Sequence, residues 1–226
     1  MGNFAYNFSF GFITSYWDVL LKGFFITLQL SLYAIILSTI LAVILGALMS
    51  RENKFVKYLF IIIVDIIRSI PLLVLVLICY YALPVFGIFV NPFWPALLAL
   101  VLDTGAFLGD VIRGSIEGIP KGAMMSARVL GMNKWLILRR IILPEVFKET
   151  MPTITLMYIG IIRLSSLASI IAVYELTHTG NWIIASTFKP LEVYLIVGLM
   201  YIIIVLPLTL LSRKFEKSNY FKRRSI

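Results

Sequence analysis

Long runs without charge dominate the pattern of hydrophobic and polar positions along this chain. No Asp, Glu, Lys or Arg lies between Lys22 and Arg51, and none lies from Val193 to Ser212. A helix needs about 20 mostly apolar residues to cross the hydrocarbon core of a membrane. Runs of this length therefore predict membrane-spanning helices. Five such spans are expected, over residues 23–50, 58–83, 96–116, 150–173 and 193–212.

The segments between these runs carry turn residues or charges. Residues 84–95 contain three prolines and Gly87, which predicts a loop. Residues 174–190 form a second short loop with His178, Gly180 and Asn181. Residues 117–149 are too charged to span a membrane. The chain is thus predicted to be an all-α membrane protein, with residues 1–226 as a single transmembrane domain.

Composition supports this class and excludes others. Apolar residues make up 61% of the chain and charged residues 14%, whereas soluble domains average roughly 45–50% and 25%. The net charge is +9. A nucleic-acid partner is not expected, because the basic residues lie between and after the apolar runs. Cys79 is the only cysteine, so no internal disulfide can form.

The basic residues predict the orientation in the membrane. With five spans, most of the 20 Lys and Arg fall on one side, in the turn 51–57, in the stretch 113–148 and in the tail 213–224. The predicted loops on the opposite side contain only two basic residues, Lys22 and Lys189. Cytoplasmic loops carry an excess of Lys and Arg. We therefore expect the N-terminus outside and the C-terminus in the cytoplasm of a multi-pass protein in the bacterial plasma membrane.

The long cytoplasmic loop, residues 117–149, predicts a helix, a turn and a second helix. Pro120 can open the first helix and Gly131 can end it. Asn133 can cap a second helix over residues 134–143, and Pro144 is expected to end or bend it. An exposed element of this kind suits docking to a partner. The alternative is a simple connection that binds anionic lipid head groups.

This loop resembles the cytoplasmic signature of permeases from ATP-binding-cassette (ABC) importers. That signature reads Glu-Ala-Ala, three residues, Gly, nine residues, then Ile-x-Leu-Pro. Here Met125-Ser126-Ala127 is followed by Gly131 at the same spacing and by Ile141-Ile142-Leu143-Pro144. The resemblance implies a coupling helix that inserts into a groove on a cytoplasmic ATPase. The residues that it assigns to coupling are Met125, Ser126, Ala127, Arg128, Gly131, Leu143 and Pro144.

Three other segments are similar to the polar amino acid branch of these permeases, which takes up glutamine, histidine, arginine or cystine. They are Arg68-Ser-Ile-Pro71-Leu-Leu, Thr104-Gly-Ala-Phe-Leu-Gly-Asp110-Val-Ile-Arg113-Gly, and Ser166-Leu-Ala-Ser169 with Glu175-Leu-Thr177. With the coupling signature they cover nearly the whole chain, in the right order. The resemblance implies the type I ABC importer permease fold and an amino-acid import function.

The resemblance also implies the partners. These are two cytoplasmic ABC ATPases that bind ATP and Mg, a second permease subunit and an extracellular or periplasmic solute-binding protein. The chain itself is expected to bind no cofactor or metal and to be no enzyme, since it has no phosphate-binding Gly-rich loop, metal-spaced His/Cys cluster or nucleophile elbow. Met125 replaces the usual Glu, which leaves open whether a different second permease carries the intact signature. The amino acid substrate is left open.

Charged residues inside the predicted spans are candidates for function. Asp65 and Arg68 are three residues apart and can pair, and Pro71 breaks the helix one turn later. Asp110 and Arg113 repeat this spacing. Structural pairing of each couple is the alternative to a role in transport.

Asp103 and Arg163 have no neighbour of opposite charge in the sequence. An Arg can hold the carboxylate of an amino acid through two hydrogen bonds, and an Asp can hold its ammonium group. Asp103, Arg163, Ser165, Ser166, Arg68 and Pro71 are the candidates for a polar substrate pathway. The alternative is that Asp103 and Arg163 pair with each other and never touch substrate.

Two further alternatives stay open at this point. Glu175 and His178, after the fourth span, could contact the solute-binding protein, or Glu175 could be a solvated helix cap. The whole chain could be a secondary transporter or channel that works without an ATPase. The odd number of spans, the lack of an inverted repeat and the patterned loop 117–149 argue against that reading.

Overall fold

The computed structural model describes the backbone of residues 8–224 and the side chains of residues 8–213. This part of the chain is helical and contains no strand. Its elements are α1 (Ile13–Met49), α2 (Lys54–Ser69), α3 (Leu72–Val85), α4 (Phe93–Glu117), α5 (Lys121–Val129), α6 (Lys134–Ile137), the π-helical turn η1 (Leu138–Ile142), α7 (Leu143–Leu164), the 3₁₀ segment η2 (Ser165–Ile171), α8 (Leu176–Thr187) and α9 (Pro190–Arg224).

Four helical segments are long and apolar enough to cross a membrane. They are α1, α4, the continuous run Lys134–Ile171 and the part Pro190–Arg213 of α9. Helices α2 and α3, with 16 and 14 residues, are each too short to span a membrane, and they form a fifth span only when taken together, with a bend of 103° between them. The predicted all-α membrane fold is confirmed. The side chains of the basic tail after Arg213 lie outside the described residues.

The break that Pro71 predicts within the span over residues 58–83 is present, because Pro71 has no amide hydrogen to continue the helix. Two other elements differ from the sequence-based prediction. The loop expected over residues 174–190 contains helix α8. The helix that includes the fourth expected span begins well before residue 150.

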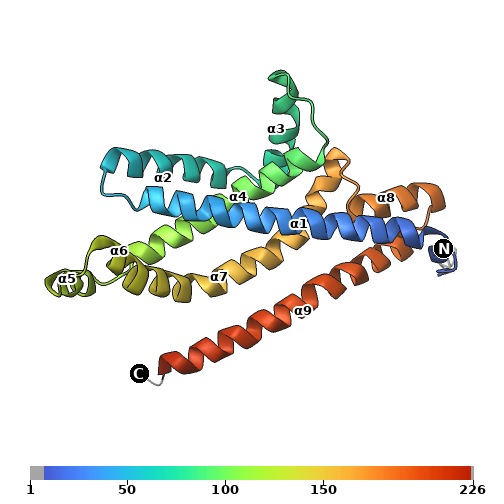
Figure 1. Cartoon of the computed structure of the whole chain (residues 1–226). Coiled ribbons are helices and arrows are strands. Elements are labelled where there is room, and N and C mark those ends of the chain that lie inside the picture. The colour runs from blue at the N-terminus through green and yellow to red at the C-terminus, as the bar shows by residue number, and fades with distance from the viewer. Residues whose placement is uncertain (1–7, 225–226) are drawn as a thin grey trace, which may run out of the picture.

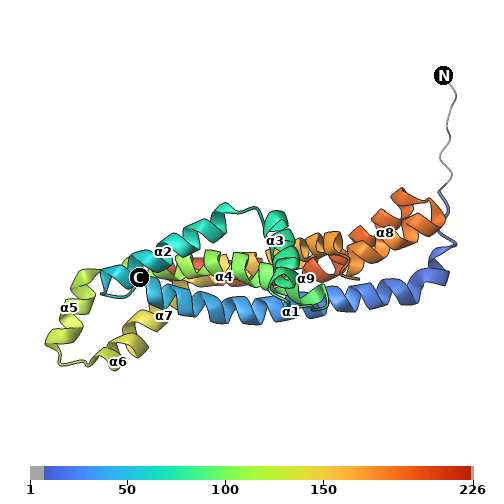
Figure 2. The same cartoon turned by 90° about the horizontal axis from the view of Figure 1, so that it is seen from above.

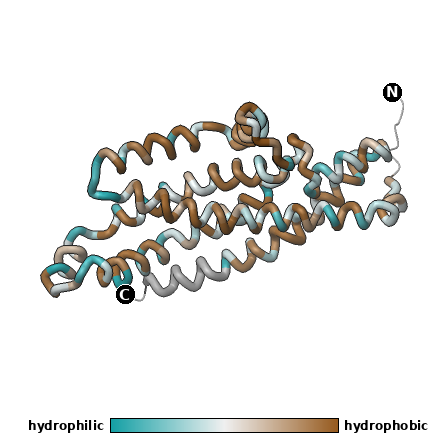
Figure 3. The backbone as a smooth tube through the Cα atoms, turned by 45° about the horizontal axis from the view of Figure 1, so that its top comes forward, coloured by the Kyte–Doolittle hydropathy of each residue, from teal (hydrophilic) through white to brown (hydrophobic). Residues whose placement is uncertain are grey.

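The long helices α1, α4, α7 and α9 run lengthwise through the molecule (Figure 1). Helix α3 stands across them. Helices α5 and α6 lie at one end, together with the C-terminal end of α9, and α8 lies near the other end beside the start of α1 (Figures 1 and 2). Hydrophobic residues fill the middle of the long helices, and hydrophilic residues gather at the ends and in the connections (Figure 3).

Helices α1 and α4 form the most extensive helix pair in the molecule. Glycines let them approach closely, as small residues do between membrane helices. A Cβ atom on Gly46 would lie 2.6 Å from Ile112, and one on Gly109 would lie 2.9 Å from the Cβ of Leu45. The pair carries buried side chains such as Leu30, Ala34 and Leu100, on which α3 and η2 pack.

We expect the substitution Gly109→Ala to destabilise the protein by about 1–3 kcal/mol, because the added methyl group meets the stiff Cβ of Leu45. The control is Gly160→Ala in α7, where no atom other than the adjoining backbone of the same helix lies within 4 Å of the added methyl group. That control should keep or slightly raise the stability, since alanine favours helices. Apparent melting temperatures of the purified variants measure both. Equal melting of Gly109→Ala and the wild type would contradict the close packing.

Candidate functional site

The predicted cytoplasmic element is built as a helix that a glycine ends. Helix α5 starts directly after Pro120 and continues to Val129. Gly131 then adopts a left-handed conformation with φ of +73°, which costs glycine little. Its amide donates to the Arg128 carbonyl at 3.0 Å, and the Met132 amide donates to the Ala127 carbonyl at 3.1 Å. These bonds close the helix as the sequence predicts.

The second predicted helix also forms. Pro144 was expected to end or bend this helix, but the helix continues past it. The Asn133 side chain accepts a hydrogen bond from the Leu136 amide at 2.8 Å and caps α6. The chain then passes through the π-helical turn η1 into α7, with Pro144 in the first turn of α7. A proline ring clashes with the carbonyl four residues earlier in a regular α-helix, and the wider π turn relieves that clash.

The coupling candidates are mostly accessible from outside the chain. Ala127 is buried. The side chains of Met125, Val129 and Leu130 are 71%, 82% and 80% exposed, and Trp135 of α6 is also exposed. The other candidates, Ser126, Arg128, Gly131, Leu143 and Pro144, are exposed too.

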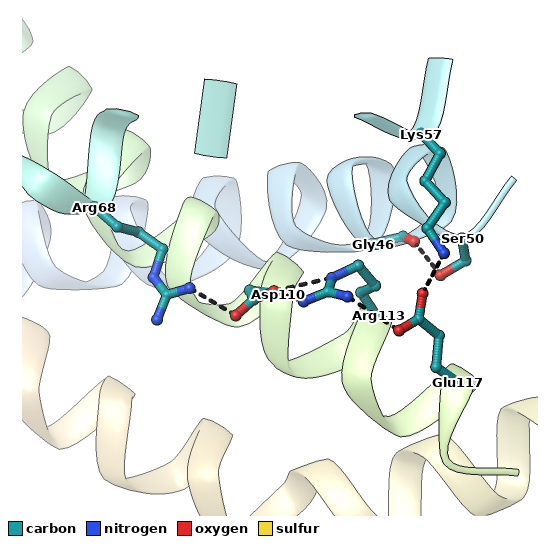
Figure 4. Close-up of polar contacts among 7 residues, drawn as sticks. All are labelled: Gly46, Ser50, Lys57, Arg68, Asp110, Arg113 and Glu117. Atoms are coloured by element: carbon teal, nitrogen blue, oxygen red, sulfur yellow. Dashed lines mark hydrogen bonds and ion pairs between the residues drawn. The ribbon is translucent and has the colours of Figure 1, made fainter. Parts of the chain in front are cut away.

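A chain of ion pairs ties α2 to α4 (Figure 4). Arg68 contacts Asp110 at 2.6 Å, Asp110 contacts Arg113 at 2.6 Å, Arg113 contacts Glu117 at 3.0 Å and Glu117 contacts Lys57 at 2.7 Å. The predicted pair of Asp110 and Arg113 is therefore confirmed.

The spacing in the sequence suggested that Arg68 pairs with Asp65. In the structure Arg68 pairs with Asp110 instead. The guanidinium points from α2 toward α4, where it meets Asp110 and lies 5.1 Å from the centre of the Phe107 ring. A carboxylate and an aromatic face thus hold this Arg on the neighbouring helix. Asp65 remains exposed on α2.

The pathway candidates on α4, α7 and η2 are not joined as an ion pair. Within the described side chains, no salt bridge links Asp103 to Arg163. Arg163 is exposed and borders a cavity of about 250 Å³ between α7 and α9, which Tyr201 and Thr209 also line. Asp103 is half-buried.

The serine hydroxyls of this group bond to the backbone. Ser165 is buried and donates to the Ile162 carbonyl at 2.8 Å. Ser166 donates to the Arg163 carbonyl at 2.7 Å. The Ser165 amide also donates to the Arg163 carbonyl, so these three neighbouring candidates are joined through the backbone of Arg163. The remaining two candidates, Arg68 and Pro71, lie elsewhere, at the break between α2 and α3.

A second polar cluster, which the sequence did not predict, centres on Glu175. This carboxyl is fully buried and accepts hydrogen bonds from the His178 amide at 2.7 Å and from the Tyr201 hydroxyl at 2.8 Å. The Leu176 amide donates to the hydroxyl of Thr27 at 3.0 Å. The cluster joins α1, the start of α8 and α9.

The position of Glu175 corrects two expectations. A fully buried side chain cannot contact a solute-binding protein, and it is not a solvated cap, although it does cap α8. Burial raises the pKa of the Glu175 carboxyl above its ordinary value, against the hydrogen bonds that lower it. The spacing of the buried residues Leu176, Thr179, Gly180 and Ile183 was a signal for α8 in the sequence.

The comparisons with known proteins agree with this architecture. Residues 38–219 match the family described as binding-protein-dependent transport system inner membrane component. The chain belongs to this family. It is a membrane translocation subunit of an ABC importer rather than an enzyme, and a multi-pass protein of the bacterial plasma membrane. The family does not support the alternative of an ATPase-independent transporter or channel. Membership implies an ATPase and a binding protein as partners.

Individual relatives cover almost the whole chain. The chain is 32% identical to the L-cystine transport system permease protein TcyB of Bacillus subtilis, over 90% of this chain and 87% of the relative. It is 28% identical to the glutamine transport system permease protein GlnP of Escherichia coli, over 88% and 92%. Among solved structures, an amino acid ABC transporter with histidines superposes with a TM-score of 0.85 at 25% identity, covering 94% of this chain and 100% of that one.

We expect protein stability to fall as the pH rises through the folded-state pKa of Glu175. The raised pKa means that the folded state holds this proton more tightly than the unfolded state, so the contribution is fully present below the unfolded pKa of about 4.3 and is lost at higher pH. Melting temperatures measured across this pH range should show the slope. Glu175→Gln should flatten it, and Glu149→Gln, at an exposed position, should not. An unchanged slope in Glu175→Gln would contradict this account.

Proposed function

We propose that this permease imports amino acids that a solute-binding protein delivers, and that α5 is the helix through which an ATPase drives it. The named relatives support the substrate class, since they transport L-cystine or glutamine. The similar solved structure, an amino acid ABC transporter with histidines, supports the same class. The four sequence segments that resemble polar amino acid permeases agree with it.

The observation that carries the coupling proposal is the apolar surface of α5 and α6. Met125, Val129, Leu130 and Trp135 are exposed on elements at one extreme end of the molecule (Figure 2). Neither α5 nor α6 lies within the middle of the bundle, where lipid would cover such side chains. An exposed apolar patch outside the membrane marks a protein interface. A groove on the ATPase is the partner that fits it.

The same end of the molecule supports the proposed orientation. The connection between α1 and α2 contains Arg51, and Lys54 begins α2 directly after it. This connection lies toward the same end as α5, α6 and the end of α9 (Figure 1). Basic residues concentrate on the cytoplasmic side of membrane proteins. In our proposal this end is cytoplasmic, so that the N-terminus is outside and the C-terminus inside.

The complete importer is proposed to hold two permease subunits, two ATPases that bind ATP and Mg, and one solute-binding protein. The five-span chain alone does not enclose a symmetric pathway. Met125 stands where the coupling signature has a Glu. Loss of that carboxylate favours, as the second subunit, a different permease that retains it.

We expect Gly131→Arg to abolish co-purification of the tagged permease with the ATPase encoded beside it. Any side chain at φ of +73° strains the backbone by about 1–2 kcal/mol, and Arg also adds a charge to the apolar patch. Gly122→Ala is the control. Gly122 is also exposed in α5, its φ is not positive, and the space around it is open. Retained binding by Gly131→Arg would contradict the role of α5.

For the substrate, we propose a path along α4, α7 and η2 that includes Asp103, Arg163, Ser165 and Ser166, with Arg68 and Pro71 near the break in the second span. The exposed guanidinium of Arg163, beside a cavity, supports it as the group that holds a carboxylate. Asp103, half-buried on α4, supplies the opposite charge for an ammonium group.

We expect Arg163→Leu to reduce ATP-driven uptake of glutamine or cystine by roughly 10–100-fold, because a charge-assisted hydrogen bond contributes about 1.5–3 kcal/mol. Arg163→Lys keeps the positive charge and should retain most of the uptake. Proteoliposomes with the ATPase and binding protein provide the measurement. Wild-type uptake by Arg163→Leu, with the ATPase still bound, would rule out this role for Arg163.

A further inference from the structure

A large apolar cavity lies between α1, α4 and α7. Its volume is about 910 Å³, within the range of about 300–1,000 Å³ that is usual for small-molecule sites. Each of the three helices contributes to its lining, for example through Ala47 on α1, Ile112 on α4 and Ile154 on α7. The cavity is a concave site between three helices, unlike the exposed apolar side of a single helix such as α9, which lipid can cover from outside.

The hydroxyl groups in this lining are already hydrogen-bonded within the chain. Those of Thr39 on α1 and Tyr158 on α7 lie 2.6 Å apart and bond to each other. Those of Thr150 and Thr155 each donate to the carbonyl four residues earlier, at 2.8 Å. Among the described residues that line the cavity, none is charged. A buried water molecule needs about two to four polar partners, so the cavity favours an apolar occupant.

The cavity occupies the depth of one membrane leaflet. On α1 the lining extends from Thr39 to Ala47, which is eight residues or about 12 Å. Arg51, where the charge-free run of this helix stops, is four residues further on. The hydrocarbon core is about 30 Å thick, so one leaflet contributes about 15 Å. Because acyl chains fill one leaflet, an acyl chain that enters beside Arg51 has the chemistry and the reach to fill the cavity.

Basic side chains lie at the end of the cavity nearest the membrane surface. Arg139 is three and four residues before the lining residues Ile142 and Leu143, and side chains at these spacings share one side of a helix. Arg140 follows it, and the α1–α2 connection with Arg51 lies toward the same end of the molecule (Figure 1). All three arginines are exposed, and none forms a salt bridge with another described side chain. Basic pockets between membrane helices bind the head groups of anionic lipids.

We propose that the cavity between α1, α4 and α7 binds an anionic phospholipid, with its acyl chains in the cavity and its phosphate group at Arg139 and Arg140. The uncharged lining suits the chains, whose hydroxyl groups need no further partner. Residues 134–144, which carry the two arginines, contain three basic side chains and no acidic one, and this suits the phosphate. A bound lipid of this kind joins the helix pair α1–α4 to α7 and stabilises the folded chain through its binding free energy.

Native mass spectrometry tests the head-group site. The tagged chain, purified in detergent with the partner subunits that it retains, is titrated with phosphatidylglycerol or with phosphatidylcholine of the same acyl chains. We expect the wild type to bind phosphatidylglycerol about 10–30-fold more tightly, because each nearby basic residue attracts an anionic lipid. The double substitution Arg139→Gln and Arg140→Gln should remove this preference. The control pair Lys22→Gln and Lys189→Gln removes the same charge at the other end of the molecule and should keep it.

Cavity-filling variants test where the acyl chains lie. Ala47→Phe places a ring in the cavity and should weaken the binding of both lipids by about ten-fold or more, since the apolar contacts are lost. Ile44→Phe is the control, at an exposed position of α1 outside the lining. Val43→Phe, at another lining position, replaces Ala47→Phe if the melting temperature shows that this variant does not fold.

Three results would overturn the lipid site. Equal binding of the two lipids by the wild type would exclude a role of the arginines in selecting an anionic head group. Unchanged binding in the variants that fill the cavity would place the acyl chains elsewhere. A wild-type complex that binds neither lipid would mean that a partner subunit covers the cavity instead.

Discussion

The close contact between α1 and α4 is the interaction on which the other elements depend. Helices in lipid gain little from hydrophobic burial against each other, so close backbone approach has to supply their association. Gly46, Gly105 and Gly109 make that approach possible. The other helices then attach to this pair, since α2, α3 and α7 pack on α4, and α8 packs on α1.

Two polar clusters fasten further helices to this pair at different levels. The ion pairs from Arg68 to Lys57 hold α2 against α4 toward the end where α5 lies (Figure 4). The Glu175 cluster holds the start of α8 and the helix α9 to α1 through Thr27 and Tyr201. Hydrogen-bonded groups of this kind are directional, whereas apolar packing tolerates sliding. They therefore fix the rotation of α2, α8 and α9 about their axes.

Much of the fold could be predicted from the sequence because lipid imposes a simple rule on length. The charge-free run after Lys22 could only be a span, and Gly131 and Asn133 act through neighbouring residues, so their caps were readable locally. Contacts between residues far apart in the sequence could not be predicted in this way. Arg68 meets Asp110 across 42 positions of the sequence, which no local spacing reveals. Pro71 signalled a break, but the angle of 103° follows from the packing of α3 on α4. Among the site residues, the burial of Glu175 depends on Tyr201 of a distant helix.

The π-helical turn at Leu138–Ile142 has a mechanical consequence. A proline that ended the helix at this point would have left a flexible joint between the cytoplasmic tip and the membrane. Because the wider turn accommodates Pro144, the helix continues without interruption over the 38 residues from Lys134 to Ile171. A displacement of the segment that carries Trp135 would therefore be transmitted along this continuous helix. Arg163 and Ser165 lie near its other end.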